Sequence, residues 1–135
     1  MEEPDEETDE LARETYRAAL EVHKRVGPGY LESVYEEGLA AELDIRDVPF
    51  ERQAEFTIDY KDREIGRGRT DFVVDDRLVV ELKAITTFKD IHRAQVISYL
   101  KALDLDLGLL FNFNAELLKD GVQRIIHSES ATHAT

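Results

Sequence analysis

The chain has no cysteine and no run of about 18 or more apolar residues of the kind that crosses a membrane. The absence of cysteine excludes disulfides, thiolate zinc sites and cysteine nucleophiles, and it fits a cytosolic protein. The acidic first ten residues, MEEPDEETDE, argue against a secretory signal peptide. We therefore expect a cytoplasmic protein without a transmembrane helix.

Positive charge is also scarce. The 135 residues include 17 Lys and Arg against 30 Asp and Glu, which gives a net charge of −13. Such a charge opposes binding to phosphate backbones at low salt. Eleven of the bases are Arg and six are Lys, and an acid-rich, lysine-poor surface suits a very salty cytoplasm. There the Debye length falls to about 3 Å at 1 M, so bulk repulsion is screened. We interpret the chain as halophilic.

Length and hydrophobic content indicate one globular domain. Hydrophobic residues make up 42% of the chain, which is typical of folded proteins. We expect a single domain over residues 8–127, an acidic disordered tail at 1–7 and a second disordered tail at 128–135. Apolar spacings of three and four predict helices over 8–26, 31–46 and 88–103. Alternating or apolar segments predict strands over 50–60, 64–74, 78–85, 105–113 and 121–127. The order α-α-β-β-β-α-β-β predicts a mixed α/β fold.

The segment VVELKA, residues 79–84, reads as a buried strand that carries two charges. Glu81 and Lys83 share one face of it, because strand side chains alternate. An ion pair at the edge of a sheet would account for them. A second acid, Asp71, lies ten residues earlier on the preceding strand. A three-residue loop at 75–77 would pair Asp71 with Glu81, whereas a two-residue loop would put the two acids on opposite faces.

The three-residue loop has a chemical consequence. Two carboxylates directly opposite each other are destabilising unless a cation neutralises them. Oxygen ligands of this kind suit Mg²⁺ or Mn²⁺. Lys83 beside such a metal would orient or deprotonate an attacking water, or stabilise charge on a phosphate.

These residues form a known signature. Asp71, Glu81 and Lys83 stand as D-x9-E-x-K, which resembles the motif of the PD-(D/E)XK nuclease superfamily. Thr70 stands where that motif can have a proline. The resemblance implies a restriction-endonuclease-like mixed sheet flanked by helices, with the site at one edge of the sheet. It implies that Asp71, Glu81 and the Leu82 carbonyl bind the metal and that Lys83 is the catalytic lysine.

Two flanking motifs extend the resemblance over about residues 10–127. GYLESVYEE contains G-x-x-E-x-x-Y with Glu32, similar to the GxxExxY proteins, a small-domain branch of the superfamily. QVISY contains Q-x-x-x-Y through Gln95 and Tyr99, similar to a motif of RecB-like nucleases. The resemblance implies that Glu32 completes or supports the metal site and that Gln95 and Tyr99 bracket it. Taken alone, Glu32 also reads as an acid near a helix N-terminus, Gln95 as a core amide and Tyr99 as core packing.

Several other residues have two interpretations. His23 corresponds to a metal ligand in some RecB-like nucleases, but a single His on a helix is usually structural. Arg67 and Arg69 lead into Asp71, and Lys89 and Arg93 lie near the next helix. These four bases, with Tyr99, are candidates for contacting a nucleic-acid backbone, and each of the bases also reads as an ordinary solvated charge.

We therefore expect a Mg²⁺- or Mn²⁺-dependent nuclease that hydrolyses phosphodiester bonds in DNA. The alternative is a non-catalytic module that keeps the nuclease fold and binds nucleic acid or protein. A structural domain with an ion pair at the edge of its sheet is a third reading. Small nucleases of this superfamily often dimerise, so the resemblance is also compatible with a homodimer.

Overall fold

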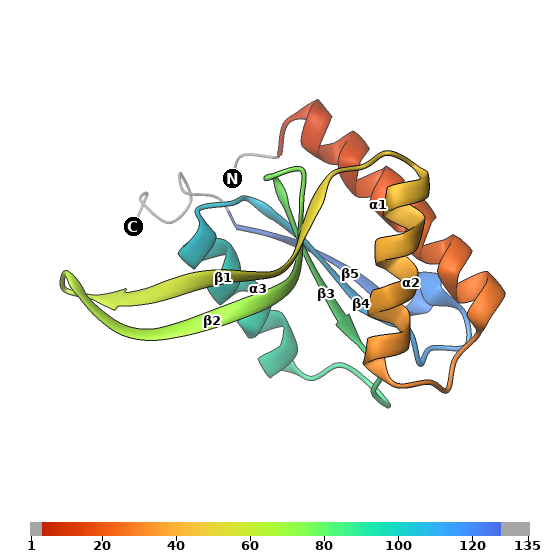
Figure 1. The fold of residues 1–135 in the computed structure, drawn as a ribbon. Coiled ribbons are helices and arrows are strands. Elements are labelled where there is room, and N and C mark those ends of the chain that lie inside the picture. The colour runs from red at the N-terminus through yellow and green to blue at the C-terminus, as the bar shows by residue number, and fades with distance from the viewer. Residues whose placement is uncertain (1–3, 128–135) are drawn as a thin grey trace.

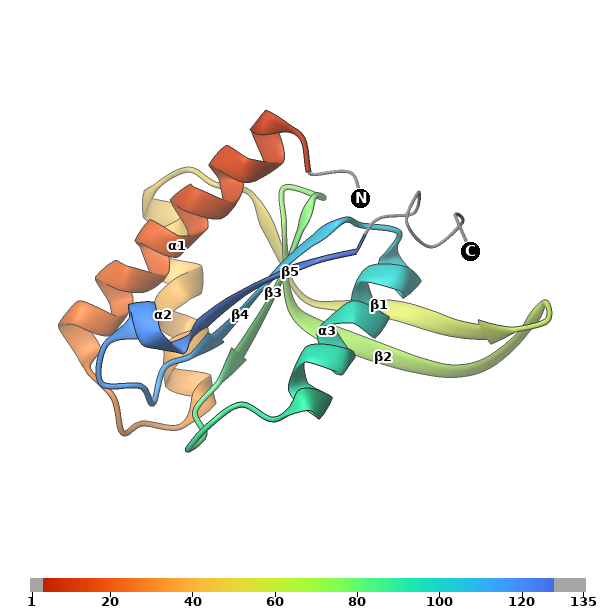
Figure 2. The ribbon, with the colours of Figure 1, turned by 180° about the vertical axis from the view of Figure 1, so that it is seen from behind.

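The computed structural model describes residues 4–127, which form one five-stranded sheet with helices on both faces (Figures 1 and 2). The elements are α1 (Glu6–Val26), α2 (Glu32–Ile45), β1 (Phe50–Tyr60), β2 (Arg63–Val74), β3 (Leu78–Lys83), α3 (Asp90–Leu103), β4 (Leu107–Asn112), the short 3-10 helix η1 (Leu118–Gly121) and β5 (Val122–Ile126). The strands lie in the order β1-β2-β3-β4-β5. β3 and β4 run parallel, and the other neighbouring pairs are antiparallel. The expected mixed α/β fold with flanking helices is confirmed.

Each face of the sheet has its own apolar core. One core lies under α1 and α2 and includes Tyr35, Leu39, Leu43, Phe72, Val80, Leu82 and Phe111. The other lies under α3 and includes Val79, Val96, Leu100 and Leu110. Val79 therefore faces α3, whereas its neighbour Val80 faces α1 and α2, as strand alternation requires. The same alternation directs Glu81 and Lys83 to the side of α3.

The first helix starts earlier than expected. Asp5 caps α1, because its Oδ1 accepts a hydrogen bond from the Thr8 amide at 2.8 Å, and a capped helix end is stabilised. The expected disordered tail at 1–7 was therefore wrong for residues 5–7. The expected tail at 128–135 lies outside the described residues. Among the described helices, none is long and apolar enough to cross a bilayer.

β3 ends two residues earlier than expected, at Lys83. The Ile85 amide donates to Asn112 Oδ1 at 3.1 Å, and Asn112 Nδ2 donates to the Ile85 carbonyl at 2.9 Å. One buried asparagine side chain thus replaces strand pairing at Ile85 and turns the chain toward α3. α3 consequently begins at Asp90, two residues later than expected.

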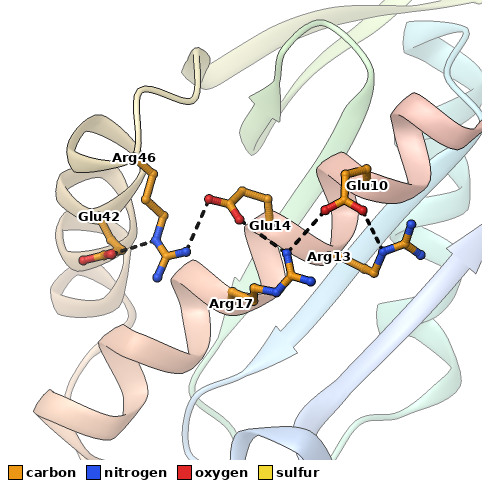
Figure 3. A network of polar contacts seen from close by, with 6 residues as sticks. All are labelled: Glu10, Arg13, Glu14, Arg17, Glu42 and Arg46. Carbon is orange, nitrogen blue, oxygen red and sulfur yellow. Dashed lines mark hydrogen bonds and ion pairs between the residues drawn. The ribbon is translucent and has the colours of Figure 1, made fainter.

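A row of alternating charges links α1 to α2 (Figure 3). We call it the ion-pair chain, and it consists, in order of contact, of Arg13, Glu10, Arg17, Glu14, Arg46 and Glu42. Its nitrogen–oxygen distances run from 2.7 to 3.5 Å. Every acid in the chain has at least one arginine neighbour.

β1 and β2 form a hairpin whose far end projects beyond the rest of the sheet (Figures 1 and 2). We call residues 54–70 of this hairpin the arm. At its base, Arg52 pairs with Phe72 and Ala54 pairs with Thr70. Gln53 lies between these pairs in the left-handed backbone conformation, with φ of 51°. The arm therefore begins beside Asp71.

Candidate active site

The hairpin between β2 and β3 has the register that the acid pair requires. Phe72 pairs with Val80, and the connecting loop contains the three residues 75–77. The predicted three-residue loop is confirmed. The strand pairing ends at Phe72 and Val80, so Asp71 and Glu81 are the first residues beyond it on the two strands.

At this point, hydrogen bonds to the carboxylates of the two acids replace backbone hydrogen bonds between β2 and β3. The Asp71 amide donates to Glu81 Oε1 at 2.7 Å, and the Leu82 amide donates to Asp71 Oδ2 at 2.8 Å. Thr70 Oγ1 also donates to Glu81 Oε1, at 2.7 Å. Within residues 4–127, Glu81 Oε2 accepts no hydrogen bond. Each carboxylate thus has one oxygen in short contact with the protein, and the other oxygen of Asp71 has only a long contact, 3.5 Å from Gln53 Nε2.

The charges of this pair are poorly compensated. Glu81 is 6% exposed. Its burial, together with repulsion from Asp71, raises the pKa of Glu81 to about 7. Burial also raises the pKa of Asp71, and the charges of Glu36 and Glu32 add to that rise. Lys83 opposes both shifts but is the smallest of the influences. Buried carboxylates in this state favour a proton or a cation nearby.

α2 brings an acid to this edge of the sheet that the sequence analysis did not single out. Gln53 Nε2 donates to Glu36 Oε1 at 2.9 Å and lies 3.5 Å from Asp71 Oδ1. Arg52 Nη2 lies 2.6 Å from Glu36, so the charge of Glu36 is compensated. Glu32 is exposed and acts on Asp71 through its charge, less strongly than Glu36 does. Because Glu32 and Glu36 are one helical turn apart, the spacing could have indicated Glu36.

The sequence of this chain matches a family model over residues 9–125, and the family is described as the PD-(D/E)XK nuclease superfamily. The chain belongs to the PD-(D/E)XK nuclease superfamily. The crystal structure of SSO0001 is similar to it, with a TM-score of 0.56 and 20% identity over 74% of this chain. The chain spans 52% of the length of that protein, and the likeness concerns the fold. No curated protein matches the chain.

The oxygen atoms at the acid pair fit the divalent cation that nucleases of this superfamily generally use. Asp71 and Glu81 each leave one carboxylate oxygen without a short protein contact. The Leu82 amide faces β2, and the carbonyl of a strand residue points to the same side as its amide. In residues 4–127, no three His, Cys, Asp or Glu side chains are grouped to hold a metal. Two carboxylates completed by water are a ligand set of the kind that Mg²⁺ often takes.

α3 brings one of its two predicted residues to the acids. Burial, and then the charges of Glu81 and Asp71, raise the pKa of the Tyr99 hydroxyl. The Tyr99 ring also packs on Phe56 of the arm, with centroids 5.0 Å apart. Gln95 is half-buried on the same helix, and within residues 4–127 it forms no hydrogen bond to either acid. Tyr99 is thus a side chain of α3 whose pKa responds to the charges of both carboxylates.

The four predicted phosphate-binding residues are all exposed. Arg67 pairs with Glu64 at 3.1 Å, and Arg69 lies on the arm opposite Glu55. Arg93 donates a hydrogen bond to Gln123 at 3.3 Å. Lys89 stands at the N-cap position of α3, where its backbone amide donates to His92 Nδ1 at 2.9 Å. These four bases are accessible to a ligand, but only Arg69 and Arg67 lie on the strand that contains Asp71.

The remaining motif residues support the nuclease fold of this chain. The Tyr35 hydroxyl donates to the Gly27 carbonyl at 2.7 Å and accepts from the Tyr30 amide at 3.1 Å. It thus fixes the turn that leads to Glu32. His23 is buried and hydrogen-bonds the Ala115 carbonyl at 2.8 Å. This contact fits the structural role that a single His on a helix usually has.

Proposed function

We propose that this protein is a divalent-metal-dependent nuclease of the GxxExxY, RecB-like branch that hydrolyses phosphodiester bonds in DNA. The observation that carries the proposal is the acid pair. Glu81 is nearly completely buried opposite Asp71, and within residues 4–127 neither acid forms an ion pair within 4.0 Å. Burying such charges is costly, so a bound cation gives the arrangement a physical reason.

The chain's own residues divide the work as follows. Asp71, Glu81 and the Leu82 carbonyl would hold Mg²⁺ or Mn²⁺. The bound cation supplies Lewis-acid stabilisation of the negative charge that develops on the phosphate. Lys83 lies two residues after Glu81 and on the same strand face. There it orients or deprotonates the attacking water. The water oxygen bonds to phosphorus as the P–O ester bond breaks, and the leaving oxygen takes up a proton.

Residues around the acids would position the substrate. Arg69 and Arg67 continue along β2 from Asp71, so their guanidinium groups can neutralise phosphates next to the reacting one. Lys89 and Arg93 offer further charges near the start of α3. Glu32 supports the cation from α2 through its charge. A homodimer would bring two such sites to the two strands of a duplex.

The direct test is DNA cleavage in molar KCl with Mn²⁺ or Mg²⁺, using plasmid, linear duplex and single-stranded substrates. We expect Glu81→Gln and Lys83→Met to lower the cleavage rate by about 10²–10³-fold, because each removes a group that acts on the transition state. Glu42→Gln is the matched control, since it removes a carboxylate from the ion-pair chain. Equal rates in all variants, or no cleavage of any substrate by the wild type, would refute the nuclease. DNA binding without cleavage would instead favour a non-catalytic module.

A further inference from the structure

A groove of about 560 Å³ lies between the arm and α3. Phe56, Ile58 and Asp59 line it from β1, and Tyr99, Lys101 and Ala102 line it from α3. None of these residues except Tyr99 belongs to the site described above. The groove therefore adds a surface whose role the acid pair does not explain.

Two aromatic rings form one corner of the groove. The rings of Phe56 and Tyr99 are tilted by 44° to each other, with centroids 5.0 Å apart. The Phe56 ring lies directly over Gly68 of β2, where an added Cβ would come within 2.5 Å of the ring. Glycine at residue 68 thus allows the ring to lie against the backbone. The same arm leaves Ile58 44% exposed and Tyr60 57% exposed.

The charges in the groove do not suit a phosphate. Its lining contains one acid, Asp59, and one base, Lys101, so it has no excess positive charge. By contrast, Arg67 and Arg69 alternate along β2 with Gly66 and Gly68. The positive charges of the arm therefore lie outside the lining of the groove. Aromatic rings and aliphatic side chains with a few polar groups are typical of pockets for small organic ligands.

The groove lies along β2 from the acid pair and shares Tyr99 with its surroundings. Phe56 pairs with Gly68, which lies three residues along β2 from Asp71, or about 10 Å in an extended strand. Tyr99 links the groove to the acid pair, because it lines the groove and the charges of Glu81 and Asp71 help to raise the pKa of its hydroxyl. A ligand in the groove can therefore be part of the same molecule as a phosphate at the acids.

We propose that the groove binds one nucleobase of the DNA strand whose phosphate lies at Asp71 and Glu81. Bases stack on aromatic side chains irrespective of sequence, and the half-buried Tyr99, supported by the buried Phe56, offers such a surface. A base that enters the groove cannot remain paired in a duplex. The inference rests on the proposed nuclease function, and it specifies the substrate as single-stranded or locally unpaired DNA.

The first test needs no cleavage. In ¹H–¹⁵N correlation spectra of the wild type, titration with the nucleosides thymidine and adenosine should shift amides of 56–59 and 98–102. Inorganic phosphate should not shift them. Ala102→Trp, which fills the groove from an exposed position of α3, should abolish the nucleoside shifts. Ala41→Trp, at an exposed position of α2, should leave them intact. No nucleoside shifts in the wild type, or shifts that depend only on protein concentration, would overturn the proposal.

The second test places the base relative to the cut. A set of single strands, each with one abasic nucleotide, should show one position close to the scissile phosphate where KM rises by about tenfold. That penalty should vanish in Ala102→Trp and persist in Ala41→Trp. A penalty that is the same in both variants would overturn the proposed base-binding role of the groove but leave the nuclease proposal intact. If the wild type cleaved none of the strands, the nuclease proposal would be refuted. The nucleoside titration would still show whether the groove binds a base.

Discussion

Two regions of this molecule concentrate carboxylates and treat them in opposite ways. In the ion-pair chain (Figure 3), Glu10, Glu14 and Glu42 each contact an arginine. In the acid pair, Asp71 and Glu81 receive hydrogen bonds from backbone amides and from Thr70. The first arrangement is complete within the protein. The second holds two buried negative charges in place and leaves them to be neutralised by something else.

The two regions also shift acid pKa values in opposite directions. A hydrogen bond from Arg13, supported by Arg17, lowers the pKa of Glu10. Burial raises the pKa of Glu81 to about 7. Folding is therefore favoured by ionising Glu10 and disfavoured by ionising Glu81. A protein that kept Glu81 only for its fold would gain stability by replacing it, so this cost is an argument for function.

The largest effect we predict is a pH dependence of stability that comes from Glu81. Its pKa of about 7 in the folded chain, against 4.5 for an ordinary Glu, corresponds to about 3 kcal/mol. Because the folded pKa is raised, this stability is present below about pH 4.5 and is lost as the pH rises through about 7. Urea unfolding in EDTA should thus give a larger free energy of unfolding near pH 5 than near pH 8.

The control for this measurement is the other acidic region. Glu81→Gln should flatten the dependence between about pH 5 and pH 8. Glu10→Gln should leave it unchanged, because the lowered pKa of Glu10 places its contribution at more acidic pH, where stability is lost as the pH falls. An equal slope in the wild type and in Glu81→Gln would show that Glu81 is not the titrating group.

The second prediction concerns the cation. Mn²⁺ at 10–100 times its dissociation constant should raise the free energy of unfolding by about 1.4–2.7 kcal/mol, because it binds the folded chain. Asp71→Asn should remove this gain, whereas Glu42→Gln should keep it. Thermal unfolding in molar KCl measures both, since salt suppresses loose binding to surface acids. A gain of the same size in Asp71→Asn would place the cation elsewhere.

The sequence left the acid pair as one of two possible registers, and the three-residue loop that it requires is present. Strand alternation put Glu81 and Lys83 on one face, and the three-residue loop put Asp71 opposite Glu81. The carboxylate–amide bonds that end the β2–β3 pairing could not be predicted, because they depend on the side-chain rotamers of both acids. Neither could the contact between Glu36 and Gln53, which joins a helix to a strand far apart in sequence. The roles assigned to the site residues stay predictions.

The third prediction separates the backbone of Gln53 from its side chain. A left-handed conformation costs a residue other than glycine about 1–2 kcal/mol, and such strain is common at functional sites. Gln53→Gly should therefore be about 1 kcal/mol more stable than Gln53→Ala. Both variants lose the side-chain amide of Gln53, which lies between Glu36 and Asp71. Both should therefore cleave DNA about 10–100-fold more slowly than the wild type. Cleavage at the wild-type rate in Gln53→Gly would show that the amide does not position Asp71.

The smallest effect should come from the ion-pair chain. Glu42→Gln removes one partner of Arg46, whose other partner, Glu14, lies 3.3 Å away. Partly exposed ion pairs are worth about 0.2–1 kcal/mol, so we expect a loss in that range at low salt, with unchanged DNA cleavage. At about 1 M salt the Debye length is about 3 Å, and the loss should shrink further. If the loss of stability instead persisted in molar KCl, the ion-pair chain would act through packing and desolvated hydrogen bonds. The two acidic regions would then differ less in burial than in what neutralises them.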